Sequence, residues 1–381
     1  MPKSKKNIII FTDWFLPAYK AGGPIQSIAN LTNHLKETYA IWVVTSNSDI
    51  DEELNIDKTL LNTWVRKEGY QVMYLDIQHQ NSNTYKQIFN DVPVHAVYFN
   101  SLFSLKFTLI PLWMTKNSPV KKVLAPRGML GKGALAIKPT KKKVFLKGFK
   151  MLNLPNKIEW HATDSSEEQE IITTFGKNMH IQVVPNLSAK MPDHAPVKQK
   201  KENALNLFFL SRISIKKNLL LIIEALHKVP KAYSINFKII GPIEEKHYWT
   251  QCLNLLNQLP QHINYEYLGA IPNQELKNTL KNLHVLILPT QHENFGHVIM
   301  EAWQNGCPVI ISKNTPWQDL EIKKTGFDLD IESHHDFVKA ISYFAAMNQD
   351  TFDVLSKSSF HFAKDFTENP ELITKTKALF Q

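Results

Sequence analysis

The chain has 381 residues, 43% hydrophobic and 21% charged, a composition typical of a globular protein. This length exceeds one ordinary hydrophobic core, so we expect two domains. Two cysteines are too few for a disulfide framework and favour a reduced, cytoplasmic setting. No run approaches the roughly 18 uninterrupted apolar residues of a spanning helix, which disfavours a membrane-embedded protein.

The excess positive charge lies in the first half. Residues 1–190 carry 24 Lys and Arg against 15 Asp and Glu, a difference of +9, whereas residues 191–381 carry 20 of each. Residues 92–158 contain 13 Lys and Arg and no Asp or Glu. A solvated helix face normally mixes the two signs, so this segment indicates an anionic partner. Nucleic acid, an anionic membrane and an anionic acceptor all remain open, as does a lysine surface that only aids solubility.

Short apolar runs between polar turns predict buried strands through the first half. We expect them at residues 8–11, 40–45, 70–75, 96–99, 123–125 and 181–186. Apolar residues at helical spacing predict a helix over residues 25–35, and Asp164 caps a second one that has acidic residues in its first turn.

Gly22 and Gly23 precede the first of these helices. Paired glycines at a helix start let backbone N–H groups approach an anion, although a plain tight turn explains them equally well. They do not form the G-x-G-x-x-G fingerprint of dinucleotide sites, so NAD binding has weak support.

A polar segment with two prolines, residues 191–203, is typical of a linker. After it the alternation restarts, with strands expected at 205–210, 235–240, 263–268, 285–289, 309–311 and 326–330, and helices at 219–229, 248–259, 272–283, 295–303, 333–347 and 351–365. Two runs of alternating strand and helix predict an α/β protein with two doubly wound, Rossmann-like domains facing across a cleft. We place these domains at residues 1–190 and 204–365, with 366–381 as a tail or helix that packs back on the first domain.

Glu293 lies in the turn that follows strand 285–289, where an open parallel sheet binds ligands, and Glu301 lies eight positions further on, inside the next helix. On a continuous helix, side chains eight positions apart are separated by roughly 12 Å of rise and point roughly 80° apart. This geometry disfavours a shared metal or a paired acid and base. It favours two contacts at opposite ends of a long ligand, with the Gly296 and His297 amides facing an anion between them. A turn glutamate that caps the helix and an exposed helix glutamate are the simpler alternative.

Two cations five positions apart, Arg212 and Lys217, lie in the loop between strand 205–210 and its helix. This loop is also at the carboxyl end of a strand, so the pair suits a diphosphate, although a solvated basic loop is possible. Gly241 ends the next strand on the same side and leaves room for a base or ribose.

These motifs together resemble a known family. The segment from Glu293 to Glu301 resembles the E-x7-E motif of the retaining glycosyltransferases of family 4 (group 1), which have the GT-B fold. Arg212 and Lys217 resemble that family's donor-diphosphate cations, Gly22-Gly23 its glycine loop, and Val184-Pro-Asn186 the turn before its interdomain linker. The resemblance runs from about residue 8 to residue 366 and is more specific in the second half.

The resemblance implies a nucleotide-sugar-binding second domain and an acceptor-binding first domain. It implies transfer of a sugar, with retention, from a UDP- or GDP-sugar, with Glu293 on sugar hydroxyls and Glu301 on the ribose. Arg212 and Lys217 would stabilise the departing diphosphate. The donor-binding residues would be Gly23, Gly241, Asn294, Phe295, Gly296, His297 and Glu301. No metal and no cofactor are expected beyond the nucleotide sugar, which is a co-substrate.

The acceptor side matches the family less well. Where many relatives place a His after the fourth strand, this chain has Asn100, which can hydrogen-bond a hydroxyl but cannot act as a base. We select Arg127, at the end of a strand, as an acceptor or phosphate contact. His161 is a further candidate contact, with a satisfied buried histidine as the stronger reading. The Asp49-Ile-Asp51 and Asp328-Leu-Asp330 strings are expected to be structural rather than metal-binding, the second as part of an edge strand.

Given a transferase, the acid-free region suggests attachment to a membrane. We expect basic segment 105–157 to hold the enzyme at the inner face of the cell membrane, close to a glycan or polyprenyl-diphosphate-linked acceptor. The pathway would be biosynthesis of capsule, lipopolysaccharide or exopolysaccharide. The alternatives are another GT-B nucleotide-sugar enzyme, such as a hydrolysing epimerase, and a non-catalytic nucleic-acid-binding protein. No nucleic-acid motif accompanies the charge, so nucleic acid is not expected as a partner.

Overall fold

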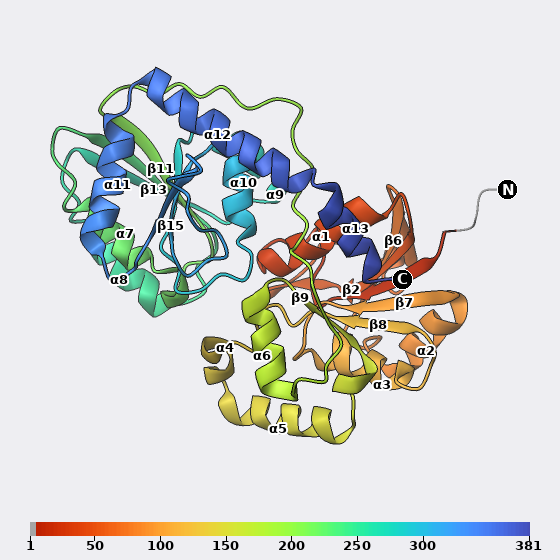
Figure 1. Ribbon diagram of the computed structural model, residues 1–381. Coiled ribbons are helices and arrows are strands. Elements are labelled where there is room, and N and C mark those ends of the chain that lie inside the picture. The colour runs from red at the N-terminus through yellow and green to blue at the C-terminus, as the bar shows by residue number, and fades with distance from the viewer. Residues whose placement is uncertain (1–4) are drawn as a thin grey trace. The chain divides into compact units, whose positions relative to one another are not determined.

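The computed structural model describes residues 5–381 and divides into two compact units (Figure 1). Unit 1 joins the chain up to Leu187 with Pro370–Gln381, and unit 2 is Ser188–Asn369. Both are built on sheets of mainly parallel strands with helices between them, so the predicted α/β class with two Rossmann-like halves is confirmed. Among the described residues, no helix is both long and apolar enough to cross a membrane.

Unit 1 contains an eight-stranded sheet in the order β10-β9-β8-β7-β1-β2-β6-β5. Its strands are β1 (Asn7–Phe11), β2 (Ala40–Ser46), β5 (Trp64–Lys67), β6 (Tyr70–Leu75), β7 (Val94–Phe99), β8 (Lys121–Leu124), β9 (Glu159–Ala162) and β10 (Ile181–Val183). All neighbours are parallel except β5 and β6, which are antiparallel. A two-stranded ribbon, β3 (Ser48–Asp49) with β4 (Glu52–Glu53), lies apart from this sheet.

Helices lie on both faces of this sheet (Figure 1). They are α1 (Gly23–Leu35), α2 (Ser82–Asp91), α3 (Ile110–Thr115), α4 (Lys132–Ala136), α5 (Pro139–Met151), α6 (Ser165–Phe175) and α13 (Pro370–Ala378), with short turns at η1 (Lys58–Leu60), η2 (Leu105–Leu109) and η3 (Pro155–Lys157). Side chains of alternate residues in β1 point to opposite faces of the sheet. Ile9 and Phe11 point to one face and belong to the apolar cluster that includes residues of α2, α3, α5 and α6. After α13, Phe380 packs against the rings of Tyr39 and Tyr98.

Unit 2 contains a six-stranded, fully parallel sheet in the order β13-β12-β11-β14-β15-β16. The strands are β11 (Ala204–Leu210), β12 (Ser234–Ile240), β13 (Ile263–Gly269), β14 (Val285–Leu288), β15 (Val309–Ser312) and β16 (Gly326–Leu329). The helices are α7 (Leu219–Leu226), α8 (Lys246–Leu256), α9 (Asn273–Leu280), α10 (His297–Gln304), α11 (His334–Ala346) and α12 (Gln349–Thr367), and a short turn, η4 (Ile215–Lys217), precedes α7. Every residue of β14 and β15 is buried, as expected for central parallel strands.

The strands and helices expected in unit 2 are confirmed to within a few residues at their ends. In unit 1, the strand expected at 181–186 ends at Val183, and its last residues form an extended turn instead. Edge strand β5 and helices α2 to α5 were not expected. The pattern of α5 is obscured because six of its thirteen residues are Lys or Gly, which mask the apolar spacing.

Both sheets have a topological switch point: successive strands are added first on one side of the unit's first strand and later on its other side. In unit 1 this point lies between β1 and β7, and in unit 2 between β11 and β14. Loops that follow the two strands at a switch point diverge to opposite faces and leave a crevice at the carboxyl ends. Asn100, Arg212, Lys217 and Glu293 lie in these loops, and Arg127 and Gly241 follow the neighbouring strands β8 and β12.

Candidate functional site

In unit 2, the loops after β11 and β14 are tied to each other. The Lys216 carbonyl accepts hydrogen bonds from the Gln291 amide (2.8 Å) and from the Thr290 hydroxyl (3.3 Å). The Glu293 amide donates to the Asn314 carbonyl at 3.0 Å, in the loop after β15. Because the loops hold one another through backbone groups, the side chains that they carry have defined positions.

Lys217 and Glu293 meet where these loops come together, although they are 76 residues apart in sequence. The Lys217 Nζ donates to the Glu293 Oε1, and the two side chains are only 9% and 15% exposed. A largely desolvated pair of this kind is held much more firmly than a surface pair, because water screens it poorly. The structure therefore brings two of the three predicted catalytic residues into direct contact.

Arg212, the third, pairs with Glu244 in the loop after β12. Its guanidinium is half-exposed, so this pair is more solvated than the one formed by Lys217. Glu244 was not selected from the sequence. The signal available was the acidic pair Glu244-Glu245, which follows the strand-ending Gly241-Pro242 after one intervening residue.

Gly241 is required by the close approach of two loops. Its φ is +141°, and a Cβ at this position would lie 1.9 Å from the Ser211 carbonyl oxygen. That neighbour is backbone and cannot swing aside, so a side chain here would push the loops after β11 and β12 apart. Gly241 thus acts by letting Arg212 and Glu244 come together, in addition to any space that it leaves for a ligand.

Helix α10 begins after Gly296, which has a φ of +78°. Glu293 precedes the helix, so the rise of a continuous helix does not set the separation of the two glutamates. Glu301 is in its second turn, half-buried, and burial raises its pKa to about 8. A carboxyl group of this kind is largely protonated at neutral pH and can both donate and accept a hydrogen bond.

The other predicted donor-binding residues differ in which of their groups could contact a ligand. The Phe295 side chain is buried against Trp317 and Phe366, and its carbonyl accepts from the Trp317 indole at 2.6 Å. His297 is also buried, with its ring 4.8 Å from that of Phe295. Contacts from these two residues to a ligand would therefore come from backbone amides. Asn294 lies half-buried in the same turn.

In unit 1, Arg127 follows β8 with a left-handed φ of +57°. Its Nε donates to the Asn100 Oδ1 (2.8 Å), its Nη2 to the Tyr98 hydroxyl (2.7 Å), and its Nη1 to the Asn186 Oδ1. These acceptors are all neutral, and no carboxylate in the described chain forms an ion pair with this guanidinium. Arg127 is thus a positioned cation whose charge is not neutralised, which suits an anionic ligand.

Asn100 is buried and holds Arg127 rather than facing solvent. Its side-chain amide donates to the Pro24 carbonyl (3.1 Å) and more weakly to the Thr12 hydroxyl (3.4 Å), next to the start of α1. Gly23 is the first residue of α1, and the preceding Gly22 has a φ of +67° with no atom within 4 Å of where its Cβ would be. The loop backbone is thus open to close approach.

His161 is a satisfied buried histidine. Its Nε2 bonds the Val184 carbonyl, which can only accept, so Nε2 carries the proton and Nδ1 accepts from the Tyr98 hydroxyl; both distances are 2.8 Å. Burial, aided by the Arg127 charge, lowers the pKa of His161 to about 3. A direct contact between its ring and a substrate would require one of these bonds to break. Its position in the chain Arg127–Tyr98–His161 is that of a support for the arginine.

The two Asp-x-Asp strings have structural partners. The Asp49 carboxylate accepts from the Tyr19 and Lys20 amides at 2.7 and 3.0 Å, and the Asp328 carboxylate in edge strand β16 accepts from the Leu320 amide at 2.8 Å. Within residues 5–381, no group of three or more His, Cys, Asp or Glu side chains is placed to hold a metal ion.

Comparison with known proteins agrees with this architecture. Residues 190–357 match the family model of glycosyl transferases group 1. A curated relative, an uncharacterized glycosyltransferase of Methanocaldococcus jannaschii, is 27% identical over 106 residues, and this match spans 28% of the chain and 26% of that protein.

Solved structures resemble nearly the whole chain. Sucrose-phosphate synthase from Thermosynechococcus elongatus has a TM-score of 0.74 and 13% identity, with 99% of this chain and 98% of that one covered. HepE of Anabaena in complex with UDP-glucose has a TM-score of 0.68 at 14% identity, and WaaG, a glycosyltransferase involved in lipopolysaccharide biosynthesis, 0.67 at 12%; each match covers 98% of both chains. At such identities the likeness shows the GT-B fold alone. Together with the family match over residues 190–357, it supports a glycosyltransferase of GT-B fold.

Proposed function

We propose that this chain is a retaining glycosyltransferase that moves a sugar from a UDP- or GDP-sugar to a glycan or polyprenyl-diphosphate-linked glycan in polysaccharide biosynthesis. The observation that carries the proposal is the cluster at the switch point of unit 2, where the loops after β11 and β14 carry Arg212, Lys217 and Glu293. The segment that matches the glycosyltransferase family model contains all three residues.

In this proposal the donor diphosphate lies against Arg212 and Lys217. As the bond from the sugar C1 to the phosphate oxygen breaks, negative charge grows on the departing diphosphate, and the two cations stabilise it without a metal ion. Preorganised charges in a poorly solvated site are commonly the largest contribution to catalysis. Lys217 is preorganised because Glu293 and the packed loops already hold its ammonium group.

The acceptor hydroxyl attacks C1 on the face that the diphosphate leaves, and its proton passes to the leaving phosphate oxygen. No protein base is required, which agrees with an asparagine at position 100. Glu293 holds sugar hydroxyls, and Glu301, largely protonated at neutral pH, bonds the ribose hydroxyls as both donor and acceptor. The backbone amides at the start of α10 face the negative charge between them.

On the acceptor side, the unneutralised charge of Arg127 suits a phosphate of a lipid-linked acceptor. Asn100, Asn186 and Tyr98 set the direction of its guanidinium. His161 holds Tyr98 from behind. These residues act through Arg127, so their replacement would misplace the guanidinium rather than remove a substrate contact.

Segment 105–157 supports the proposed membrane attachment. Val144 and Met151 are exposed, lie seven positions apart on one face of α5, and are interleaved with lysines; Ile137 is exposed just before this helix. Each lysine near an anionic bilayer contributes about 1 kcal/mol. The chain should float with anionic vesicles at low salt and separate from them at high salt; failure to float at low salt would contradict the attachment.

The donor site is tested by calorimetric titration of UDP and GDP into the wild type and Arg212→Ala. We expect one nucleotide to bind the wild type and Arg212→Ala to bind it at least about tenfold more weakly, the effect of one charge-assisted contact. If neither nucleotide binds the wild type, the transferase proposal is wrong; equal binding by both proteins would remove Arg212 alone from the site.

Catalysis is tested separately with Glu293→Gln, in a screen of nucleotide sugars for transfer or hydrolysis. The substituted side chain keeps its shape, so nucleotide binding should persist while turnover is lost. Unchanged turnover would exclude the role given to Glu293.

A further inference from the structure

A second, lysine-lined hollow lies in unit 1, away from the crevices described above. It has a volume of about 490 Å³, within the range of small-molecule sites, and is formed by the end of α3, the starts of β8 and β9, and η3. We call it the basic pocket and define it by Lys116, Lys121, Lys122, Lys157, Glu159 and His180. Four lysines against one glutamate give it a charge of +3 with His180 neutral.

The basic pocket and Arg127 lie at opposite ends of the parallel strands. Lys121 and Glu159 are the first residues of β8 and β9, whereas Arg127 comes after the last residue of β8. A ligand in the pocket would therefore bind at the amino ends of the parallel strands, separated from Arg127 by the length of β8. The pocket is thus independent of the proposed sugar transfer.

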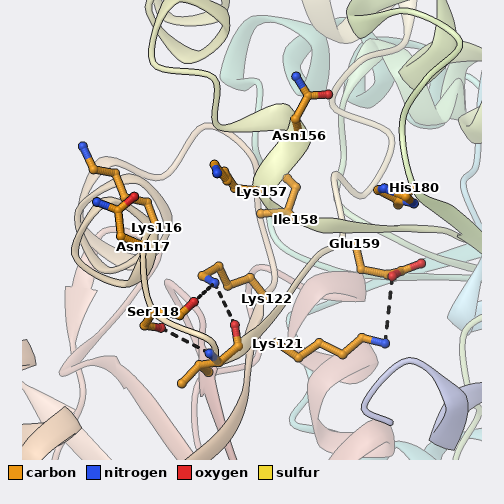
Figure 2. A pocket seen from close by; sticks show the side chains of 11 residues that line it. Lys116, Asn117, Ser118, Lys121, Lys122, Asn156, Lys157, Ile158, Glu159 and His180 are labelled. Atoms are coloured by element: carbon orange, nitrogen blue, oxygen red, sulfur yellow. Dashed lines mark hydrogen bonds and ion pairs between the residues drawn. The ribbon is translucent and has the colours of Figure 1, made fainter.

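Two of its lysines are already neutralised or engaged elsewhere. The Lys121 ammonium points toward Glu159, at 3.9 Å (Figure 2). It also donates to the Gln381 backbone oxygen at 2.8 Å. The Lys116 ammonium lies 2.9 Å from the centre of the Trp113 ring. These contacts leave Lys122 and Lys157 as the cations that face the hollow.

Lys122 and Lys157 face the same space (Figure 2), and neither forms an ion pair with a carboxylate of the described residues. Lys122 is 7% exposed, and its Nζ donates to the Ser118 and Val120 carbonyls at 2.8 and 2.7 Å. An ammonium group has three N–H donors, so one donor of Lys122 remains. Burial and the nearby charge of Lys157 both lower the pKa of Lys122. Lys157 is exposed, and its ammonium group forms no ion pair or hydrogen bond with the described residues.

Two neighbouring cations repel each other, and a buried ammonium such as that of Lys122 loses hydration that two carbonyls only partly replace. A compact anion with several oxygens would accept from both ammonium groups at once and reverse that repulsion. Lysine ammonium groups bind phosphate in this manner, each as a compact point charge. We propose that the basic pocket binds a phosphate-bearing anion, of diphosphate size or as a lipid phosphomonoester headgroup, through Lys122 and Lys157.

The test is a calorimetric titration of sodium diphosphate at low ionic strength. It is made in an Arg212→Ala background, which lowers the heat that the proposed donor site contributes. Three chains are compared: the background, the background with Lys157→Gln, and the background with Lys67→Gln. Lys67 is a matched control because it is also an exposed lysine of unit 1, but it lies on edge strand β5 at the far end of the sheet.

We expect the background and the Lys67→Gln chain to bind diphosphate equally, and Lys157→Gln to bind about tenfold more weakly. A parallel sedimentation with phosphatidylcholine vesicles, with and without phosphatidic acid, identifies the source of the phosphate: a selective loss of pelleting by Lys157→Gln indicates a lipid headgroup. If Lys157→Gln matches Lys67→Gln in both measurements, the proposal is wrong. Because both substituted lysines are exposed, loss of folding does not complicate the comparison. The result is independent of whether UDP or GDP binds unit 2.

Discussion

The contact between Lys217 and Glu293 permits a double-mutant cycle with an internal control. The two side chains are 9% and 15% exposed, so removing one partner leaves the other charge poorly solvated. Breaking a buried pair in this way typically costs about 3–5 kcal/mol. We therefore expect Lys217→Met and Glu293→Gln each to lower the free energy of unfolding by about 2–4 kcal/mol, the lower figure reflecting the remaining solvent access. The double variant should lose less than the sum, with a coupling energy above about 1 kcal/mol.

The control pair is Lys238 with Glu266, which joins β12 to β13 in the same unit at 2.7 Å. It has the same residue types, but its side chains are 35% and 57% exposed. Exposed pairs couple by about 0.2–1 kcal/mol, and we expect a value at the low end for this one. Urea unfolding of the four chains of each cycle measures both couplings. A coupling for Lys217 and Glu293 no larger than for the control would show that desolvation does not strengthen the interaction between these two residues.

Two further predictions concern unit 2. Gly241→Ala should lower the melting temperature strongly and weaken nucleotide binding, because its Cβ would lie 1.9 Å from the Ser211 carbonyl oxygen. The control is Gly269→Ala: Gly269 also has a positive φ but has open space around it, so this change should lower the free energy of unfolding by only about 1 kcal/mol. Equal losses by the two variants would refute the close-approach argument. Because burial raises the pKa of Glu301 to about 8, the folded chain binds this proton more tightly than the unfolded one, so the contribution of Glu301 to stability falls as pH rises from about 4.5 to 8. Glu301→Gln should therefore gain melting temperature relative to the wild type over this pH range, and a constant difference between the two proteins would contradict the raised pKa.

Part of the site could be predicted because it depends on local spacing. The apolar runs that became β11, β12 and β14 place Arg212, Gly241 and Glu293 after strand ends, and parallel strands present these ends on one edge. The roles of these residues in sugar transfer stay predictions, as do the retaining mechanism and the membrane attachment. In the first half the same reasoning predicted less, because lysines obscure the apolar period of α5 and polar residues interrupt β9.

The side-chain partners could not be predicted in this way. Asn100 was selected as an acceptor or phosphate contact, and that role stays a prediction. Its bond to Arg127 was not predicted, and it forms because β7 and β8 are neighbours in the sheet and bring the residues after them together. Glu244 is the partner of Arg212 because β12 lies beside β11. The basic pocket likewise depends on β8 and β9 being adjacent, which sets Lys157 near Lys122.

The sequence by itself determined which segments form strands and helices, and which polar residues follow the strands, because these depend on periodicity and turn chemistry within a few residues. The tertiary structure decided which loops meet, and therefore which charges are paired, buried or left without a partner. Strand order is set by long-range packing and hydrogen bonding, and no local spacing encodes it. For that reason the contact between Lys217 and Glu293, 76 residues apart, is a property of the fold alone.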